Sequence, residues 1–134
     1  MAARRFAYRL GRRSVPVLRL FGVRGPEDAW VELGDETLEA RFGWSSATIP
    51  IEHITRWRIE GPWHWFRAIG VRRSVRHGDI TFGGSHLGGV RIDTSVPIRI
   101  GPFRAPALYL TVADPEGLAA ALRERGIDGE DARA

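Results

Sequence analysis

Hydrophobic and polar residues alternate along most of this chain. In the stretch TLEARF, Leu38, Ala40 and Phe42 fall on one side of an extended backbone, and polar or charged residues fall on the other. The same two-residue period recurs in WVEL, ATIPI, TRWRI, DITF, VRID, VPIRI and LYLTV. A period of two is typical of strands that bury one face. The pattern therefore predicts a mainly β protein with about seven strands.

Turn signals separate these stretches. They lie at Gly34-Asp35, Gly43, Gly61-Pro62, residues 83–89 and Gly101-Pro102. Strands joined by such short connections pair mostly antiparallel, because a parallel crossover needs about a dozen residues or more. Strands with one apolar face favour two packed sheets or a partly open barrel. We expect an antiparallel barrel or sandwich.

A helical period follows near the C-terminus, in ADPEGLAAALRERG. Asp114 is a favoured N-cap residue, Pro115 suits the first helical position, and Gly126 is a natural stop. The apolar residues repeat at helical spacing, at Leu118, Ala119, Ala121 and Leu122. We expect one C-terminal helix that covers the open end of the barrel. Residues 127–134 are expected to be a frayed tail.

The N-terminus is basic: residues 1–25 hold seven arginines and no acidic residue. We interpret this segment as an extension outside a main domain at residues 26–126. Within it, residues 1–13 could form a short helix, since Phe6 and Leu10 are four apart. Such a helix would bind an anionic membrane weakly. Its contact residues would be Arg4, Arg5, Phe6, Arg9, Leu10, Arg12 and Arg13.

Composition limits the chemistry. The 134 residues suit one domain, and the absence of cysteine excludes disulfides and thiolate metal sites. The spacing of the four histidines matches no metal signature, and no serine nucleophile motif occurs. GGSHLGGV lacks the lysine of a phosphate loop and leads into a predicted strand. We expect no enzyme activity, no catalytic residue, no metal and no cofactor.

Aromatic and basic residues concentrate in GPWHWFRAIGVRR, at residues 61–73. Trp57, just upstream, alternates with arginines in a strand and is expected in the core. Most of the following aromatic rings are also expected to be buried, since each ring removes a large area from water. The alternative is an exposed interface edge that extends into SVRHGD. Its partner-binding residues would be Trp63, Trp65, Arg67, Arg72, Arg73 and Arg76.

The basic residues are all arginine, and the formal net charge is +4. No motif of the common nucleic-acid-binding domains accompanies them, so we expect no specific nucleic-acid partner. No stretch approaches the roughly 20 apolar residues of a membrane helix. Pro16 and Arg19 interrupt the one segment that could act as a signal peptide. We therefore expect a cytoplasmic protein, or one peripheral to the membrane.

Several strings resemble bacterial pleckstrin-homology-like (PH-like) domains and related uncharacterised actinobacterial proteins, between Trp30 and Gly126. These strings are VELGDETLEARFG, ATIPIEHI, GDITFGGSHLGGVRID and ALYLTVADPEGLAAAL. The resemblance implies a barrel with a C-terminal helix, and a binding or assembly role without chemistry. Phosphoinositide-binding relatives carry a basic loop between their first two strands. Here that loop is the acidic Gly34-Asp35-Glu36, so we do not expect headgroup binding.

The sequence thus predicts a non-enzymatic protein-interaction or self-assembly module, with a protein partner or a second copy as ligand. Two alternatives remain open. One is peripheral attachment to an anionic membrane through the arginine-rich N-terminus. The other is carriage of a small apolar ligand inside the barrel.

Overall fold

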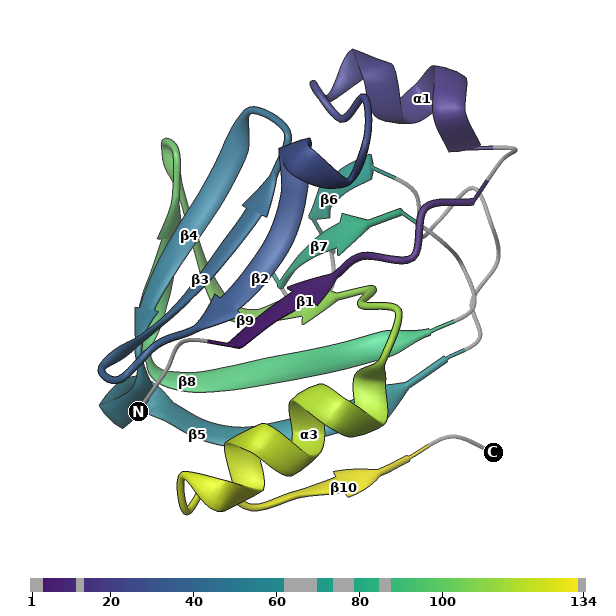
Figure 1. The fold of residues 1–134 in the computed structure, drawn as a ribbon. Coiled ribbons are helices and arrows are strands. Elements are labelled where there is room, and N and C mark those ends of the chain that lie inside the picture. Colours follow the sequence, from purple (N-terminus) through teal and green to yellow (C-terminus); the bar gives the residue numbers. More distant parts are fainter. Residues whose placement is uncertain (1–3, 12–13, 62–69, 74–78, 85–87, 133–134) are drawn as a thin grey trace.

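The computed structural model shows two β-sheets (Figure 1), and it describes residues 4–11, 14–61, 70–73, 79–84 and 88–132. The first sheet has the order β1-β2-β3-β4, and every neighbouring pair is antiparallel. Its strands are β1 (Arg4–Ala7), β2 (Ala29–Leu33), β3 (Thr37–Phe42) and β4 (Ser45–Pro50).

The second sheet has six strands in the order β10-β5-β8-β9-β7-β6. The β10–β5 and β7–β9 pairs are parallel, and the other pairs are antiparallel. Its strands are β5 (Ile54–Glu60), β6 (Gly70–Arg73), β7 (Ile80–Gly83), β8 (Gly89–Ile100), β9 (Phe103–Leu110) and β10 (Gly129–Asp131). The predicted mainly β character is confirmed. The described residues form more strands than predicted, include two parallel pairs, and do not close into a barrel.

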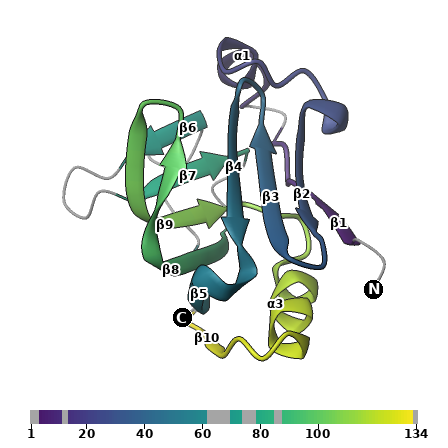
Figure 2. The same ribbon diagram turned by 90° about the vertical axis from the view of Figure 1, so that its left-hand side faces the viewer.

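The core lies between the two sheets, which cross in Figures 1 and 2. The predicted inward face of β3 is confirmed, because Leu38, Ala40 and Phe42 are at most 1% exposed. The rings of Phe42 and Phe82 stack at 5.8 Å between centroids and so join the two sheets. Trp57 is 2% exposed, as its strand pattern predicted.

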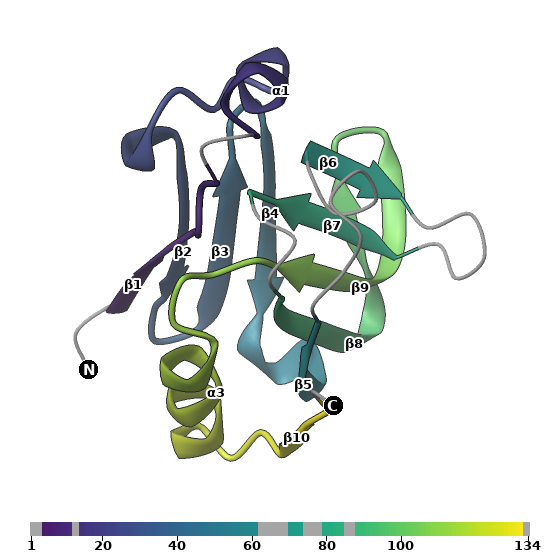
Figure 3. The same cartoon turned by 90° about the vertical axis from the view of Figure 1, so that its right-hand side faces the viewer.

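The predicted C-terminal helix is confirmed as α3 (Pro115–Glu124). The Asp114 side chain accepts a hydrogen bond of 3.0 Å from the Gly117 backbone N–H, which caps the first turn. Gly126 follows the helix with φ of +82°, a conformation that favours glycine. Figure 3 shows α3 at one end of the molecule, beside β5 and β10. Among the described residues, no helix has the length and apolar character needed to cross a membrane.

The expected N-terminal helix is wrong, because residues 4–7 form strand β1 instead. Phe6 and Tyr8 point into the core, at 7% and 5% exposure. A helix this short is marginal alone, whereas pairing with β2 satisfies the backbone and buries these two rings. The described part of the expected extension also contains a short helix, α1 (Val15–Leu20). Residues 4–8 therefore belong to the folded core.

The C-terminal tail, expected to be frayed, is docked at residues 129–131 as β10. The Trp57 indole N–H donates a 2.9 Å hydrogen bond to the Ile127 carbonyl oxygen just before it. Glu130 forms ion pairs with Arg56 and Arg58 of the neighbouring strand. These contacts, rather than any local propensity, hold the tail on the sheet.

Candidate functional site

The structure does not test the predicted aromatic and arginine surface. Trp63, Trp65, Arg67 and Arg76 lie outside the described residues. Arg72 and Arg73 lie on β6, at the edge of the second sheet, and their side chains are not described. This partner surface therefore stays a prediction.

The predicted membrane-contact residues are spread over different environments. Phe6 is buried in the core, and Leu10 is partly buried against it, so neither residue forms an insertable helix face. Arg12 and Arg13 lie outside the described residues. The exposed arginines pack locally: Arg4 over the Phe6 ring, Arg5 over Trp30 and beside Glu32, and Arg9 on the Ala113 carbonyl oxygen.

A different surface stands out at the end of the molecule that lies away from α3. The β3–β4 hairpin ends there next to α1, and the β8–β9 hairpin ends there on the other side of β4 (Figures 1 and 2). Trp44, at the β3–β4 tip, is 78% exposed, and Phe103, next to the β8–β9 tip, is 50% exposed. Leu20, the last residue of α1, is 74% exposed. Large apolar side chains this accessible are candidates for binding.

The position of Trp44 follows from the local sequence. Phe42 pairs with Ser45, so Gly43 and Trp44 form a two-residue hairpin loop. Gly43 has φ of +62°, and a Cβ there would overlap the Phe21 carbonyl oxygen. A glycine at the first loop position is typical of type II′ hairpins. The next side chain is therefore carried at the tip of the hairpin, beyond the paired strands.

Trp44 is also held in place before any ligand binds. Its backbone N–H donates to the Phe21 carbonyl oxygen at 3.1 Å, and the Gly43 N–H donates to the Asp28 carbonyl oxygen at 2.7 Å. The indole packs across Gly22, where a Cβ would lie 2.7 Å from the ring. Gly22 has φ of +86°, which also favours glycine there. The segment after α1 thus forms a support for the tryptophan.

A groove of about 500 Å³ lies between the two hairpin tips, and we call it the hairpin groove. Trp44, Ser45 and Ser46 form one wall, and residues 100–103 form the other. Val71 and Ile80 contribute apolar lining from the second sheet. This volume falls in the range of sites that accept small molecules or side chains. The hairpin groove therefore has room for an apolar group between two exposed aromatic rings.

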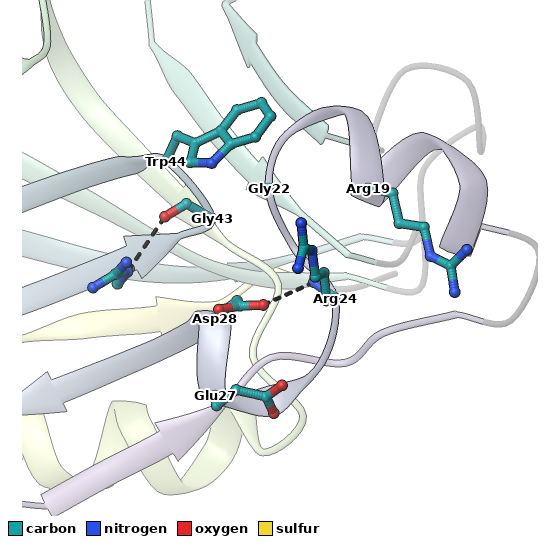
Figure 4. Close-up of a pocket in the computed structure, with 8 residues that line it drawn as sticks. Arg19, Gly22, Arg24, Glu27, Asp28, Gly43 and Trp44 are labelled. Atoms are coloured by element: carbon teal, nitrogen blue, oxygen red, sulfur yellow. Dashed lines mark hydrogen bonds between the residues drawn. The ribbon is translucent and has the colours of Figure 1, made fainter.

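A second, more polar hollow of about 310 Å³ lies next to Trp44, on the side toward α1 (Figure 4). The Arg24 backbone N–H donates to an Asp28 carboxylate oxygen at 3.0 Å, and the Arg41 Nε–H donates to the Gly43 carbonyl oxygen at 3.3 Å. Charges of both signs line it, from Arg19, Arg24, Glu27, Asp28 and Arg41. Trp44 lines both the hollow and the hairpin groove.

Two arginines face each other across the β8–β9 hairpin. Arg99 and Arg104 are direct cross-strand partners, both are exposed, and neither forms an ion pair with another described residue. Like charges in this position destabilise a sheet. On the other side of the hairpin groove, Arg41 is exposed opposite Ser46. Positive charge therefore flanks the hairpin groove on both hairpins.

A cluster of carboxylates lies elsewhere, on the second sheet and next to Arg91. Arg91 pairs with Asp93 at 2.9 Å and with Asp79 at 3.3 Å. Burial lowers the pKa of Arg91, but the hydrogen bond to Asp93 and the charges of Asp93, Asp79 and Glu60 outweigh it, so that the pKa is raised. Arg91 stays charged and holds these carboxylates as a structural network. Among the described residues, no group of three histidine, aspartate or glutamate side chains is placed to hold a metal.

Sequence reasoning missed Trp44 and Phe103. Both residues follow a turn signal that was recognised, Gly43 and Gly101-Pro102 respectively. Trp44 occupies a two-residue loop between alternating strands, so it cannot share the buried face of either strand. This placement was the available signal for an exposed ring at Trp44. Phe103 begins β9 in phase with the buried Ala105, so alternation gave no signal for its exposure.

Comparisons with models of protein families, with curated proteins and with solved structures found no match for this chain. The PH-like resemblance of the sequence strings therefore stays a prediction.

Proposed function

We propose that this chain is a non-enzymatic binding domain whose hairpin groove takes an apolar side chain of another protein chain. The observation that carries this proposal is Trp44, which is 78% exposed and yet fixed in position at the rim of the groove. A tryptophan buries a large area when it is covered, so leaving it in water favours a surface that is covered by a partner.

The composition around the hairpin groove supports a protein partner. Tryptophan and arginine are the residue types most enriched at the energetic centres of protein interfaces. Trp44, Arg41, Arg99 and Phe103 all lie on or beside the two hairpins that flank the groove. A concave site with apolar lining suits an inserted side chain better than it suits a flat lipid surface.

The rigidity of the rim supports the same conclusion. Binding loses free energy when mobile side chains have to be ordered, by about 0.5–1.5 kcal/mol for each one. The Trp44 ring already packs on Gly22, and its backbone is hydrogen-bonded to Phe21. A partner would therefore meet a rim that is largely ordered in advance.

The arrangement of elements supports a PH-like architecture as part of this proposal. A four-stranded sheet is followed by the antiparallel β5-β8-β9 unit and then by the helix α3. On this interpretation the β6–β7 hairpin and β10 are additions to the PH-like arrangement. Such a domain would bind without catalysing a reaction.

A displayed library of random peptides tests the proposed function. Peptides selected on the wild-type protein should contain apolar residues and should bind the Trp44→Ala variant about tenfold more weakly or worse. The matched control is Val15→Ala, which removes another exposed apolar side chain that does not line the hairpin groove. Its affinity should equal that of the wild type. Absence of enriched peptides, or equal binding to Trp44→Ala, would contradict the proposal.

Two parallel measurements separate the possible partners. Light scattering over a concentration series detects self-association, and loss of association in Trp44→Ala would identify a second copy as the partner. Co-sedimentation with anionic phospholipid vesicles detects membrane binding. Vesicle binding that depends on Trp44, without any selected peptide, would replace the protein partner by a membrane and overturn the proposal.

A further inference from the structure

The four strands at the sheet edges differ in charge. Within the described residues, the edges are β1 and β4 in the first sheet and β6 and β10 in the second. Three of them carry charged residues in the sequences RRFA, GVRR and GED. The fourth, β4, reads SSATIP and has none. Because charged edges discourage the addition of another strand, β4 is the edge that is least protected by charge.

The hydrogen-bonding direction of β4 can be read from its register. Phe42 and Ser45 close the two-residue loop as a hydrogen-bonded pair, and the pattern then alternates along the ladder. The Ile51 N–H donates to the Glu36 carbonyl oxygen at 2.9 Å. This bond shows that the same alternation of bonded and non-bonded pairs holds at the C-terminal end of β4. The backbone groups of Ser46 and Thr48 therefore point away from β3, toward the open edge.

This open edge borders the hairpin groove. Ser45 and Ser46 line the groove on one side, and Ile100 and Phe103 line it on the other. The last pair between β8 and β5 is Thr94 with Ile54, and beyond it β9 is the one described strand that pairs with β8. Figure 2 shows this hairpin arm running alongside β4. β8 also lies close to part of β4, so only the part of β4 that borders the groove leaves room for an extended segment, which would lie beside this arm.

The two faces of such a segment would meet different surroundings. Side chains directed inward would face the apolar lining, where Ile80 and Ile100 are 2% and 4% exposed. Side chains directed outward would share the outer face of the two hairpins with Arg41, Arg99 and Arg104. Arg99 and Arg104 form a non-hydrogen-bonded pair, whose side chains lie closest together. An acidic group nearby would relieve their repulsion.

We infer that the hairpin groove binds an extended protein segment that joins the edge of β4 as an added strand and alternates apolar with acidic residues. This inference rests on the proposed function and specifies its ligand. Added strands gain affinity from backbone hydrogen bonds and specificity from alternate side chains. Here the Ser46 and Thr48 backbone groups supply the hydrogen bonds, and the arginines select acidic residues.

Calorimetric titration with synthetic peptides tests the choice of residues. The probe is a nine-residue peptide of alternating valine and glutamate. One comparison peptide has lysine in place of glutamate, and the other has the same composition in two blocks. We expect the alternating acidic peptide to bind at least about tenfold more tightly than either comparison, and binding should weaken with added salt. Equal affinity of the acidic and lysine peptides, or no binding of the acidic peptide, would overturn the inference.

Substitutions at Ser46 test the added strand. Ser46→Pro removes the N–H that points to the open edge and leaves the bonds to β3 in place, so binding should fall about tenfold or more. Ser46→Ala keeps this N–H and should bind within about twofold of the wild type. Circular dichroism checks that both variants are folded. If peptides from the displayed library bind Ser46→Pro as well as the wild type, strand addition is wrong while the proposed function stands.

Amide hydrogen exchange in the wild-type protein provides a second measurement, which needs no folded proline variant. The acidic peptide should slow exchange at Ser46 and Thr48, because their N–H groups would enter the new ladder. Residues that already bond to β3, such as Ala47, should change less. Unchanged exchange at Ser46 and Thr48 under saturating peptide would also refute strand addition.

Discussion

The hydroxyl of Tyr8 lies inside the core and has no hydrogen-bond partner among the residues that the structure describes. The ring itself packs edge-on against Phe42, at 5.1 Å between centroids. Burial raises the pKa of Tyr8 well above its usual value, because the ionised phenolate would be poorly solvated there. A buried hydroxyl without a partner costs about 1–3 kcal/mol. The packed ring of Tyr8 therefore stabilises the fold, and its unpaired hydroxyl reduces that stabilisation.

Replacing Tyr8 by phenylalanine should stabilise the protein. The free energy of unfolding, measured with urea at neutral pH, should rise by about 1 kcal/mol because the unsatisfied hydroxyl is removed. The wild type should also lose stability as pH rises above about 10, since the unfolded state then ionises a tyrosine that the fold keeps protonated. Tyr8→Phe should lack this part of the alkaline loss. An unchanged or lower stability would show that the hydroxyl is satisfied.

At this scale the sequence predicts buried residues better than exposed ones. Trp57 was predicted correctly, because it alternates with polar residues in a strand and the alternation fixes its face. Trp44 lies in a loop, where no period applies and turn geometry decides exposure. The support from Gly22 comes from a segment about twenty residues away, which no local pattern reveals.

Among the elements, β10 requires a close approach of its backbone to Trp57. A Cβ at Gly129 would overlap the Trp57 backbone oxygen and its indole ring. The strand is only three residues long, and each of them is exposed. Its attachment therefore depends on the absence of a side chain at Gly129, together with the ion pairs of Glu130.

A Gly129→Ala substitution should detach β10 from β5. We expect a loss of about 1–3 kcal/mol in the free energy of unfolding, as for other overpacked sites. The exposed Asp128→Ala is the control and should change stability by less than about 0.5 kcal/mol. Hydrogen exchange provides a local measurement, because the Ala132 N–H donates to the Ile59 carbonyl oxygen at 2.8 Å. Unaltered protection of Ala132 in Gly129→Ala would contradict this account.

Elements with a sustained period were predictable, and short ones were not. The helix α3 combines an N-cap, an apolar stripe and a glycine stop, and all three signals were read correctly. Residues 4–10 fit both periods, since Phe6 and Leu10 suit a helix whereas Phe6 and Tyr8 suit a strand. Only pairing with β2 decides between them. The three residues of β10 are too few to carry any period.

For the molecule as a whole, the N-terminal segment joins the two sheets. It pairs with β2 through β1, and the Ala113 N–H donates to the Ala7 carbonyl oxygen at 2.8 Å. The Arg9 N–H donates to the Thr111 carbonyl oxygen at 2.9 Å, just beyond β9. A boundary at residue 26 would therefore cut through the core. The sequence missed this because arginines dominate the composition of the segment.

Deleting residues 1–8 should disrupt the fold, because it removes β1 together with Phe6 and Tyr8. We expect broad, weakly cooperative thermal unfolding, which calorimetry would detect. Arg4→Ala removes one exposed charge from the same strand and should melt within a few degrees of the wild type. A truncated protein that unfolds as sharply as the wild type, at a similar temperature, would show that the segment is dispensable.

The pairing order of the second sheet was beyond sequence reasoning. The parallel β7–β9 pair joins strands that are not consecutive, with β8 on the other side of β9. Alternation reports which face of a strand is buried and does not report its neighbour. The hairpin groove arises from the relative placement of two hairpins, so it could not be predicted either.

Pro50 limits what the open edge of β4 can become. Its backbone faces away from β3, like those of Ser46 and Thr48, but proline has no N–H to donate. An added strand would therefore find no N–H donor at Pro50, and the hydrogen-bond ladder could not extend along the whole edge. Fibril growth needs long, uninterrupted edges that template further copies. If a strand adds to this edge as proposed, Pro50 would limit the length of the ladder and disfavour fibril growth from it.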